Sequence, residues 1–298
     1  YGTVCLIGAV IGTLTALWLK ADKEAIKDGL FGFNGALVAI ALVAYTSQNF
    51  AHGNLPNWHL WSYILVSAAF TSVLVPAFGA LLGPYKVPGL TMPFVLAGWW
   101  FLAALLQFTT IDVSSALKPT SPADFPGPTP EYSWGTWFYG ITNGIAEIFF
   151  QDNWVSGVII LIGIAINTRL GALMALMGST LAVGVAVLYG AHDDAIRDGL
   201  FGYNAALTAM ALGGLFLVLN VPGFLYTVLG ILITARVWAS IGIFLEPTGM
   251  PVLTSAFVLV TWLMLLAKNG FKALIPIPPA EATTPEENLQ RYRESQKR

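Results

Sequence analysis

The sequence predicts an all-α polytopic membrane protein that contains two inverted homologous repeats. Three observations indicate this fold class. Hydrophobic residues make up 56% of the 298 residues and charged residues only 10%, against roughly 25% charged residues in soluble domains. Apolar runs recur along the whole chain. Finally, residues 25–37 (AIKDGLFGFNGAL) return as residues 195–207 (AIRDGLFGYNAAL), identical at ten of thirteen positions. Repeats of this kind in membrane proteins place a candidate site where the two copies meet.

Nine apolar runs predict membrane spans, because each approaches the length needed to cross roughly 30 Å of hydrocarbon. Gly and Pro interrupt some of them, and a few are short. The expected spans lie near residues 3–19, 28–46, 60–83, 91–108, 154–167, 171–189, 198–217, 222–245 and 252–267.

Two polar stretches set the domain boundaries. Residues 109–133 are rich in Pro, Ser and Thr, which predicts a surface linker, and residues 268–298 predict a solvated tail. We therefore expect a first repeat over 1–108, an extracellular linker over 109–133, a second repeat over 134–267 and a polar cytoplasmic tail over 268–298.

The repeat extends beyond the first phrase. Residues 88–96 (PGLTMPFVL) match residues 251–259 (PVLTSAFVL) at an offset of 163 rather than 170, so we expect the second copy to lack seven residues of the loop over 48–58. Residues 135–170 have no upstream counterpart. The first repeat is therefore expected to be N-terminally incomplete, with a segment of at least about 35 residues preceding Tyr1.

The number of spans predicts the orientation. Residues 135–152 are short and carry Glu147, and a carboxylate is costly in a lipid-facing span, so we expect a re-entrant pore helix there. Five full crossings per copy is an odd number, which inverts one copy relative to the other. With the linker outside, eleven Lys and Arg side chains lie in the cytoplasm and two, Lys118 and Arg197, lie outside. This distribution follows the positive-inside rule.

Glu147 is the first candidate site residue, because an ionisable group inside the membrane indicates function. We interpret it as a hydrogen-bond acceptor that lines a pore. The alternative is a structural carboxylate paired with Arg236, the one basic residue inside a predicted span.

Thr91 and Thr254 are related by the repeat, and each lies three residues after a Pro. We interpret them as a pair of hydroxyls near the pseudo-twofold axis. The alternative is that each hydroxyl bonds to its own helix backbone, which is common for Thr in membranes.

Phe33 and Tyr203 form a second symmetric pair, and each precedes an Asn, Asn34 or Asn204, that can satisfy free backbone groups. Phe150 lies three residues after Glu147, so on a helix the two would share a face. An aromatic ring beside an acceptor suits a flat polar solute better than an ion. Plain packing is the alternative for all three rings.

The sequence lacks the residues that several other functions would need. Cys5 is the single cysteine, so the chain has neither a disulfide framework nor a cysteine zinc site. No predicted span contains a Ser/His pair or a mid-membrane His, and no Asn-Pro-Ala pair occurs. A net charge of −2 gives no reason to expect nucleic acid. We therefore expect no enzyme activity, no metal and no cofactor.

Together, residues 28–37 with their copy, residues 88–94 with their weaker copy and residues 147–153 (EIFFQDN) resemble the urea transporter family, in its bacterial form. The resemblance covers about residues 1–270. It implies two inverted halves, each of five membrane helices and one re-entrant pore helix, with one pore at the pseudo-twofold axis of each protomer of a homotrimer. The sequence departs from the family pattern at Val87, Trp154 and Tyr203.

The resemblance also implies residue roles. Glu147 would bind urea nitrogen at one end of a selectivity filter, and Phe150 and Tyr203 would form an aromatic slot there. Thr254 and Thr91 would line the centre, and Phe33 would contribute to the slot of the other half. The implied activity is passive, channel-like flux of urea across the inner or plasma membrane.

Two alternatives remain at this point. The first is a facilitator for another small neutral solute, such as a short amide or ammonia. The second is a membrane scaffold or sensor that does not conduct. Urea fits the residues because it is flat and neutral, and an acceptor such as Glu147 can replace water hydrogen bonds whose loss would cost several kcal/mol.

Overall fold

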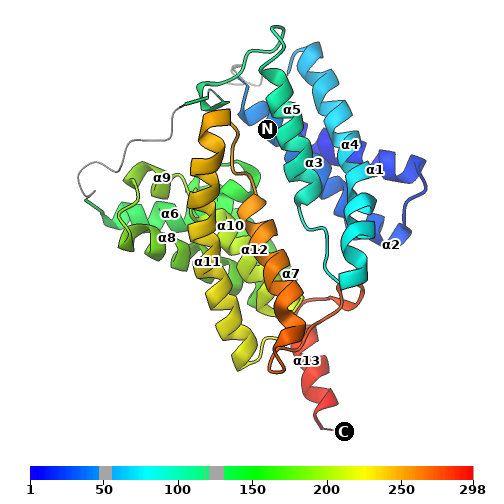
Figure 1. Ribbon diagram of the computed structural model, residues 1–298, viewed down its shortest axis with the longest axis vertical. Helices are drawn as coiled ribbons and strands as arrows, with labels where there is room; N and C mark the ends of the chain where they lie inside the picture. Colours follow the sequence, from blue (N-terminus) through cyan, green and yellow to red (C-terminus); the bar gives the residue numbers. More distant parts are fainter. Residues whose placement is uncertain (47–55, 118, 121–130, 298) are drawn as a thin grey trace. The chain divides into compact units, whose positions relative to one another are not determined.

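The regular secondary structure of the described residues is helical, as the sequence predicts. The computed structural model (Figure 1) describes residues 1–46, 56–117, 119–120 and 131–297. Residues 48–55 of the loop over 48–58, and Lys118 and residues 121–130 of the linker over 109–133, therefore lie outside the described residues. The chain divides into two units: unit 1 is Tyr1–Pro84, Pro88–Ala123 and Gly242–Leu253, and unit 2 is Tyr85–Val87, Asp124–Ile241 and Thr254–Arg298.

Unit 1 is built around one central helix. Its helices are α1 (Gly2–Trp18), α2 (Lys23–Lys27), α3 (Leu30–Ala44), α4 (Trp58–Leu82) and α5 (Met92–Leu105), with 3-10 turns η2 (Gly83–Tyr85), η3 (Ser115–Leu117) and η6 (Glu246–Thr248). Helix α3 packs against α1, α4 and α5, and its side chains from Leu37 to Val43 are all buried. It begins after Gly29, whose φ of 75° is a left-handed conformation that glycine adopts without steric cost. Helix α3 is therefore the core of this unit.

Small residues bring α1 and α3 together. A Cβ atom placed on Gly8 would lie 2.5 Å from the Gly35 carbonyl oxygen, and one on Gly35 would lie 2.5 Å from the Gly8 oxygen. Backbones that approach so closely gain dispersion contacts, which drive helix association in lipid. The glycines of α3 thus have a packing role in addition to any role in bending the chain.

Unit 2 contains the remaining helices. They are α6 (Trp134–Ala146), α7 (Trp154–Asn167), α8 (Arg169–Leu188), α9 (Asp193–Arg197), α10 (Gly202–Met210), most of α11 (Val221–Leu245), α12 (Ser255–Ala267) and α13 (Pro285–Ser295), with the short turns η4 (Glu147–Phe149), η5 (Ala211–Leu215), η7 (Lys268–Gly270) and η8 (Pro279–Glu281). Figure 1 shows α11 and α12 side by side, and the Tyr226 hydroxyl of α11 donates to the Met264 carbonyl of α12 at 3.0 Å.

The helices recur at the two offsets found in the sequence. Helix α9 starts 170 residues after α2 (193 − 23), and α11 starts 163 residues after α4 (221 − 58). Because Asn204 of α10 lies 170 residues after Asn34 of α3, whereas α11 follows α4 at 163, the difference of seven residues falls between α3 and α4.

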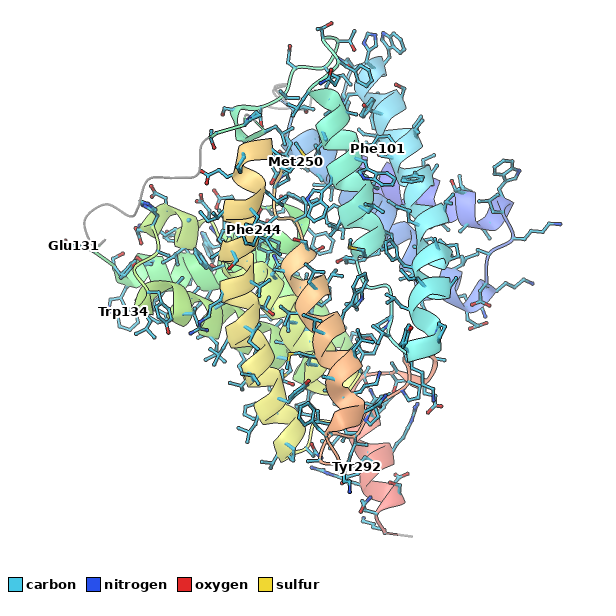
Figure 2. The ribbon with its side chains drawn as sticks, in the orientation of Figure 1. Phe101, Glu131, Trp134, Phe244, Met250 and Tyr292 are labelled. Carbon is cyan, nitrogen blue, oxygen red and sulfur yellow. The ribbon has the colours of Figure 1, made fainter. Side chains whose placement is uncertain are left out.

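The surface of the protein is apolar enough to face lipid. Large apolar side chains project from it, including Trp134 and Phe244 (Figure 2), which are 90% and 76% exposed. Among the described residues, three helical stretches are long and apolar enough to cross a membrane: Trp58–Tyr85, Arg169–Leu188 and Val221–Thr248. Four shorter apolar helices accompany them: Gly2–Trp18, Leu30–Ala44, Met92–Leu105 and Ser255–Gly270. Helix α3, at 15 residues, rises only about 23 Å, but its protein neighbours cover it in place of lipid.

The expectation of a solvated tail over 268–298 is wrong for part of its length. Residues 285–295 form helix α13, in which Pro285 and Asn288 are buried. The start of this helix is readable in the sequence: Thr284 accepts a hydrogen bond from the Glu287 N–H at 3.4 Å, and Pro285 occupies the first helical position, where its missing N–H costs nothing. Polar composition alone does not show that a buried Asn can be fully hydrogen bonded.

Candidate functional site

A sharp break between α6 and α7 holds the first candidate residues. The two helices are bent by 71°, as in a broken span or a re-entrant loop. Glu147 opens the short turn η4 and is partly buried, and the charges of Asp152 and Asp198 act on it. Within the described part of the chain its carboxylate makes no hydrogen bond and no ion pair. Glu147 is therefore an acceptor available to a solute.

Phe150 makes the reversal at this break. Its φ of 55° lies in the left-handed region, which costs a non-glycine residue of order 1–3 kcal/mol and marks functional sites in many proteins. The Gln151 side chain stabilises the turn by donating to the Phe149 and Phe150 carbonyls at 3.2 and 3.1 Å. The prediction that Glu147 and Phe150 share a helix face is wrong, because the helix ends before Phe150.

A polar pocket lies behind this turn. Asn143 donates through Nδ2 to Asp152 at 2.8 Å and to the Arg197 carbonyl at 2.9 Å, which ties the turn to the end of α9. The open pocket has a volume of about 270 Å³ and is lined by Asn143, Asp152, Arg197 and Asp198, among others. The tie fixes the position of the two carboxylates whose charges act on Glu147.

Tyr203 lies at the start of α10 and packs against the same turn. Its ring is 7% exposed and contacts a cluster that includes Ile148 and Ala206. The Trp238 indole N–H donates to the Tyr203 hydroxyl at 3.2 Å. The buried hydroxyl, which departs from the family pattern, thus has a partner from α11.

Thr254 is linked to Tyr203 through a shared tie between helices. The residue after Tyr203, Asn204, accepts a hydrogen bond from the Phe257 N–H at 2.8 Å, and Thr254 lies just before α12, three residues ahead of Phe257. The Asn side chain satisfies a backbone N–H that α12 cannot. In unit 2, the turn η4 and the helix α12 therefore both contact α10, the helix that carries Tyr203.

Unit 1 contains the same tie. Asn34, the residue after Phe33, accepts a hydrogen bond from the Phe94 N–H at 3.1 Å, which ties α3 to the helix that follows Thr91. Thr91 is buried at the start of α5, and its side chain does not cap that helix. Phe33 is 36% exposed, five times as much as its counterpart Tyr203.

The alternative interpretation of Glu147 is wrong. Arg236 is exposed, donates to the Leu232 carbonyl at 2.6 Å and to the Tyr189 hydroxyl at 3.1 Å, and lies over the Tyr189 ring. Its charge is therefore satisfied on α11 and α8. Within the described residues, moreover, no group of three or more His, Cys, Asp or Glu residues could hold a metal ion.

Sequence reasoning missed several residues of this site. Trp238 carries no signal of its own in an apolar span, since its role depends on which ring lies opposite. Asn143 and Asp152 are polar residues around the predicted re-entrant turn, and that position was a signal that could have identified them. The prediction that Asn34 and Asn204 satisfy free backbone groups is confirmed, although the groups belong to the neighbouring helices.

The broken helices, the buried polar ties at the breaks and the apolar exterior define a multi-pass membrane protein of the class whose helix breaks form solute sites. The urea transporter family model matches residues 1–269. Urea transporter 1 of Ovis aries is 31% identical over 295 residues, and that of Capra hircus is 30% identical; each alignment covers 98% of this chain and 74% of the relative. Urea transporter 1 of Mus musculus is 29% identical over 299 residues. The chain therefore belongs to the urea transporter family, whose members are transport proteins and not enzymes.

Proposed function

We propose that this protein conducts urea passively, as a channel, down the urea gradient. The family and the names of the relatives support urea as the permeant. The filter is formed by the acceptor Glu147, the rings of Phe150, Tyr203 and Phe33, and the hydroxyls of Thr91 and Thr254.

The observation that carries this proposal is the available carboxylate of Glu147 beside the strained turn at Phe150. A carboxylate oxygen accepts hydrogen bonds from N–H groups, and urea carries such groups along its edges. Losing a water hydrogen bond without replacement costs several kcal/mol in an apolar medium, so an acceptor placed there lowers the barrier for urea. Hydrated ions gain no such replacement.

The matched ties support a filter with contributions from both halves. Asn34 and Asn204 are 170 residues apart, and their partners Phe94 and Phe257 are 163 apart. Each tie joins the Asn that follows an aromatic residue of one helix to a backbone N–H three residues after the threonine that precedes the next helix. These matched ties support two homologous repeats, over 1–108 and 134–267, whose walls are equivalent in the proposed filter.

Parity in the second repeat supports an inverted arrangement. Glu286 of the tail accepts from the Leu170 N–H at the start of α8, and Ile277 of the tail donates to Phe216 just after η5. The start of α8, the end of α10 and the tail then share one side of the membrane, as alternating crossings require. With the re-entrant segment entering and leaving on the other side, the second repeat makes five crossings, an odd number.

The distribution of Lys and Arg assigns the shared side to the cytoplasm. The C-terminus is then cytoplasmic, in an inner or plasma membrane. The family resemblance extends the proposal to a homotrimer with one complete pore in each protomer.

Urea uptake into proteoliposomes tests the proposal. The wild-type protein should take up labelled urea faster than empty liposomes, with no dependence on a proton gradient. Glu147→Ala should lower this flux about tenfold, which corresponds to one lost hydrogen bond to a charged group. The matched control is Glu131→Ala, which removes an exposed carboxylate outside the filter.

Two outcomes would overturn the proposal. Wild-type flux equal to that of empty liposomes would exclude urea conduction and favour the scaffold or sensor. Flux of ammonia or a short amide without flux of urea would favour the alternative of a facilitator for another small neutral solute. Equal flux for Glu147→Ala and Glu131→Ala, with both proteins folded by size-exclusion chromatography, would remove Glu147 from the filter.

A further inference from the structure

Helix α10 ends in a turn that contains one residue more than its counterpart. Thr46 pairs with Val113 and Leu217 pairs with Pro276 as isolated bridges. The second residues are 163 apart (276 − 113), but the first are 171 apart (217 − 46), not 170 as at Asn34 and Asn204. The extra residue lies in η5, one turn of π-helix in which the Phe216 N–H bonds to the Ala211 carbonyl. Single π-turns occur at functional sites in many proteins.

This turn leaves backbone carbonyls outside the regular helix ladder. Gly213 and Gly214 depart from helical geometry, and Gly214 has a φ of 117°. Carbonyls released in this way need donors, because an unpaired buried polar group costs free energy comparable to a lost hydrogen bond. The structure supplies these donors from the tail.

Asn288 of α13 is that donor. Its side chain is 4% exposed, and its Nδ2 donates to the Gly214 carbonyl at 2.8 Å and to the Leu215 carbonyl at 3.4 Å. Its Oδ1 accepts from the Thr283 hydroxyl at 2.8 Å. Pro285 packs so closely that a Cβ atom on Gly214 would lie 2.6 Å from the Pro285 Cβ. Asn288 therefore recognises the broken turn itself.

Glu286, which also lies on α13, forms hydrogen bonds to the start of the neighbouring helix α8. Its carboxylate accepts from the Leu170 N–H at 2.7 Å and from the Thr168 hydroxyl at 2.6 Å. These groups lie at the start of α8, where free N–H groups and the helix dipole favour an anion. Helix α8 also packs against α10, so one short helix fixes both.

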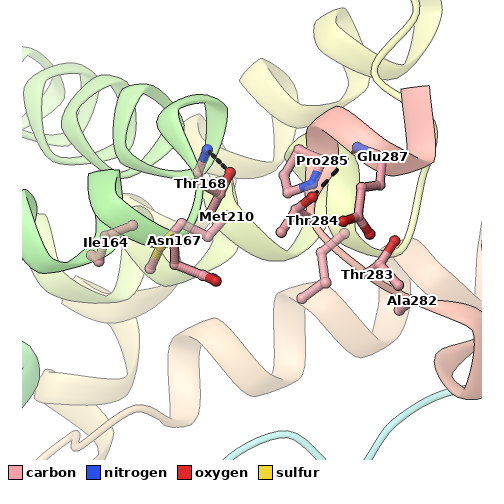
Figure 3. A pocket seen from close by; sticks show the side chains of 11 residues that line it. Ile164, Asn167, Thr168, Met210, Ala282, Thr283, Thr284, Pro285 and Glu287 are labelled. Carbon is pink, nitrogen blue, oxygen red and sulfur yellow. Dashed lines mark hydrogen bonds between the residues drawn. The ribbon is translucent and has the colours of Figure 1, made fainter. Parts of the chain in front are cut away.

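The hold depends on few contacts. Figure 3 shows a pocket beside α13, with Thr168 and Asn167 on one wall and Thr284 and Pro285 on the other. Its volume is about 470 Å³. Because this space separates part of the tail from α7 and α10, apolar packing does not cover the whole tail helix. The hydrogen bonds of Asn288 and Glu286, together with the packing of Pro285 on Gly214, are thus the contacts that define its position.

We propose that α13 is a clamp on the pore-lining helix α10, and that Asn288 and Glu286 are positioning residues for Tyr203. The proposal rests on the proposed function, because it assigns Tyr203 to the filter wall. Hydrogen bonds hold α10 at several points: Tyr203 to Trp238 and Thr208 to Thr234 of α11, Asn204 to α12, and, at its far end, Gly214 to α13 and Phe216 to Ile277. Releasing the Gly214 bond loosens this far end, and the shift is transmitted along α10 to the Tyr203 ring.

The sharpest variant is Asn288→Asp, which keeps the shape and the acceptor oxygen but removes the donor. The matched control is Gln290→Glu, the same change from amide to carboxylate on an exposed residue of the same helix. The first readout is the ratio of urea flux to N-methylurea flux in proteoliposomes. This ratio does not depend on how much protein is folded, so a merely structural defect leaves it unchanged.

Asn288→Asp should lower the ratio at least about threefold, because a loosened slot admits the larger solute, and a coupling of this size is typical of residues that act through a packed element. Gln290→Glu should leave it unchanged. If Asn288→Asp does not fold, Glu286→Gln replaces it and should change the ratio in the same direction. An unchanged ratio in the folded variant overturns the positioning role.

The second readout separates this inference from the proposed function. Hydrogen–deuterium exchange of residues 205–219 needs no permeant, and it should become at least about threefold faster in Asn288→Asp. If the wild type conducts no urea but exchange still quickens, the proposed function fails and the clamp stands. If exchange is the same in Asn288→Asp, Gln290→Glu and the wild type, the clamp is overturned.

Discussion

Helices α3 and α10 carry almost the same sequence phrase, yet they end in opposite ways. Helix α3 runs without a break from Leu30 to Ala44, and the Thr46 hydroxyl bonds to the Val43 carbonyl beyond its end. Helix α10 is regular only from Gly202 to Met210 and then opens into the π-turn η5. One helix thus completes its end with a local side chain, and the other needs a partner 74 residues away, Asn288.

The comparison shows which part of the repeat is tied to the candidate site. The shared part is the beginning of each helix, where Asn34 or Asn204 holds the start of the next helix. The part that differs is the far end, which lies away from the residues of the proposed filter. Equivalent walls of the proposed filter can therefore coexist with different support at the ends of the two helices.

The largest effect that separates the two helices is expected at Gly35. Its counterpart in α10 is Ala205, so Gly35→Ala gives α3 the residue of α10. The added methyl group would lie 2.5 Å from the Gly8 carbonyl oxygen, and overpacking of this kind costs about 1–3 kcal/mol. We expect a clearly lower thermal unfolding temperature in detergent.

The matched control for this prediction is Ala205→Gly, which makes α10 resemble α3. It should cost at most about 2 kcal/mol, because a Gly inside a helix costs about 1 kcal/mol relative to Ala and the lost methyl group is buried. If Gly35→Ala unfolds at the wild-type temperature, the close approach of α1 and α3 is not needed for stability.

The next effect concerns the tail contact that unit 2 has at Glu286. Burial alone would raise the pKa of Glu286, but hydrogen bonds from Leu170 and Thr168 outweigh it and hold the pKa below its ordinary value of 4.5. A depressed pKa means that the charged form stabilises the fold. This contribution is complete above pH 4.5 and is lost as the pH falls through the folded pKa.

Glu286→Gln should therefore destabilise the protein at pH 7 by about 0.5–1 kcal/mol, the value of a partly exposed helix cap. The difference from wild type should shrink as the pH falls below the ordinary glutamate value. Unfolding temperatures at a series of pH values measure this. A difference that persists unchanged to the lowest pH would mean that the carboxylate charge has no role.

Periodicity and composition predicted most of the helices, since apolar runs bounded by polar loops leave few choices in a membrane. The expected span over 154–167 has the same bounds as α7. The break at Phe150 could be predicted only in part. A carboxylate in a short apolar run indicates a re-entrant segment, but no pattern in residues 147–153 shows that Phe150 adopts a left-handed conformation.

The partners of the site residues could not be predicted, for a physical reason. Trp238 and Tyr203 are 35 residues apart, and Asn288 and Gly214 are 74 apart. Such pairs depend on the packing of whole helices, which one sequence does not encode as a local pattern. The repeat was the exception, because it predicted that Phe33 and Tyr203, and Thr91 and Thr254, would have equivalent neighbours, and their Asn ties are equivalent.

The smallest effect tests the middle of the two helices. Thr208 of α10 shares a hydrogen bond of 3.0 Å with Thr234 of α11, whereas the counterpart of Thr208 in α3 is Val38. Thr208→Val removes this bond and should cost about 0.6 kcal/mol, the mean for such bonds between membrane helices. Val38→Thr should raise the free energy of unfolding by a similar amount, because the new hydroxyl can bond to Thr71. Thr71 is the counterpart of Thr234 and is buried in α4. Thermal unfolding of both variants and of the double variant measures whether the stability gained in Val38→Thr offsets the stability lost in Thr208→Val. A loss on Val38→Thr as large as on Thr208→Val would show that the two helices differ in the middle as well as at their ends.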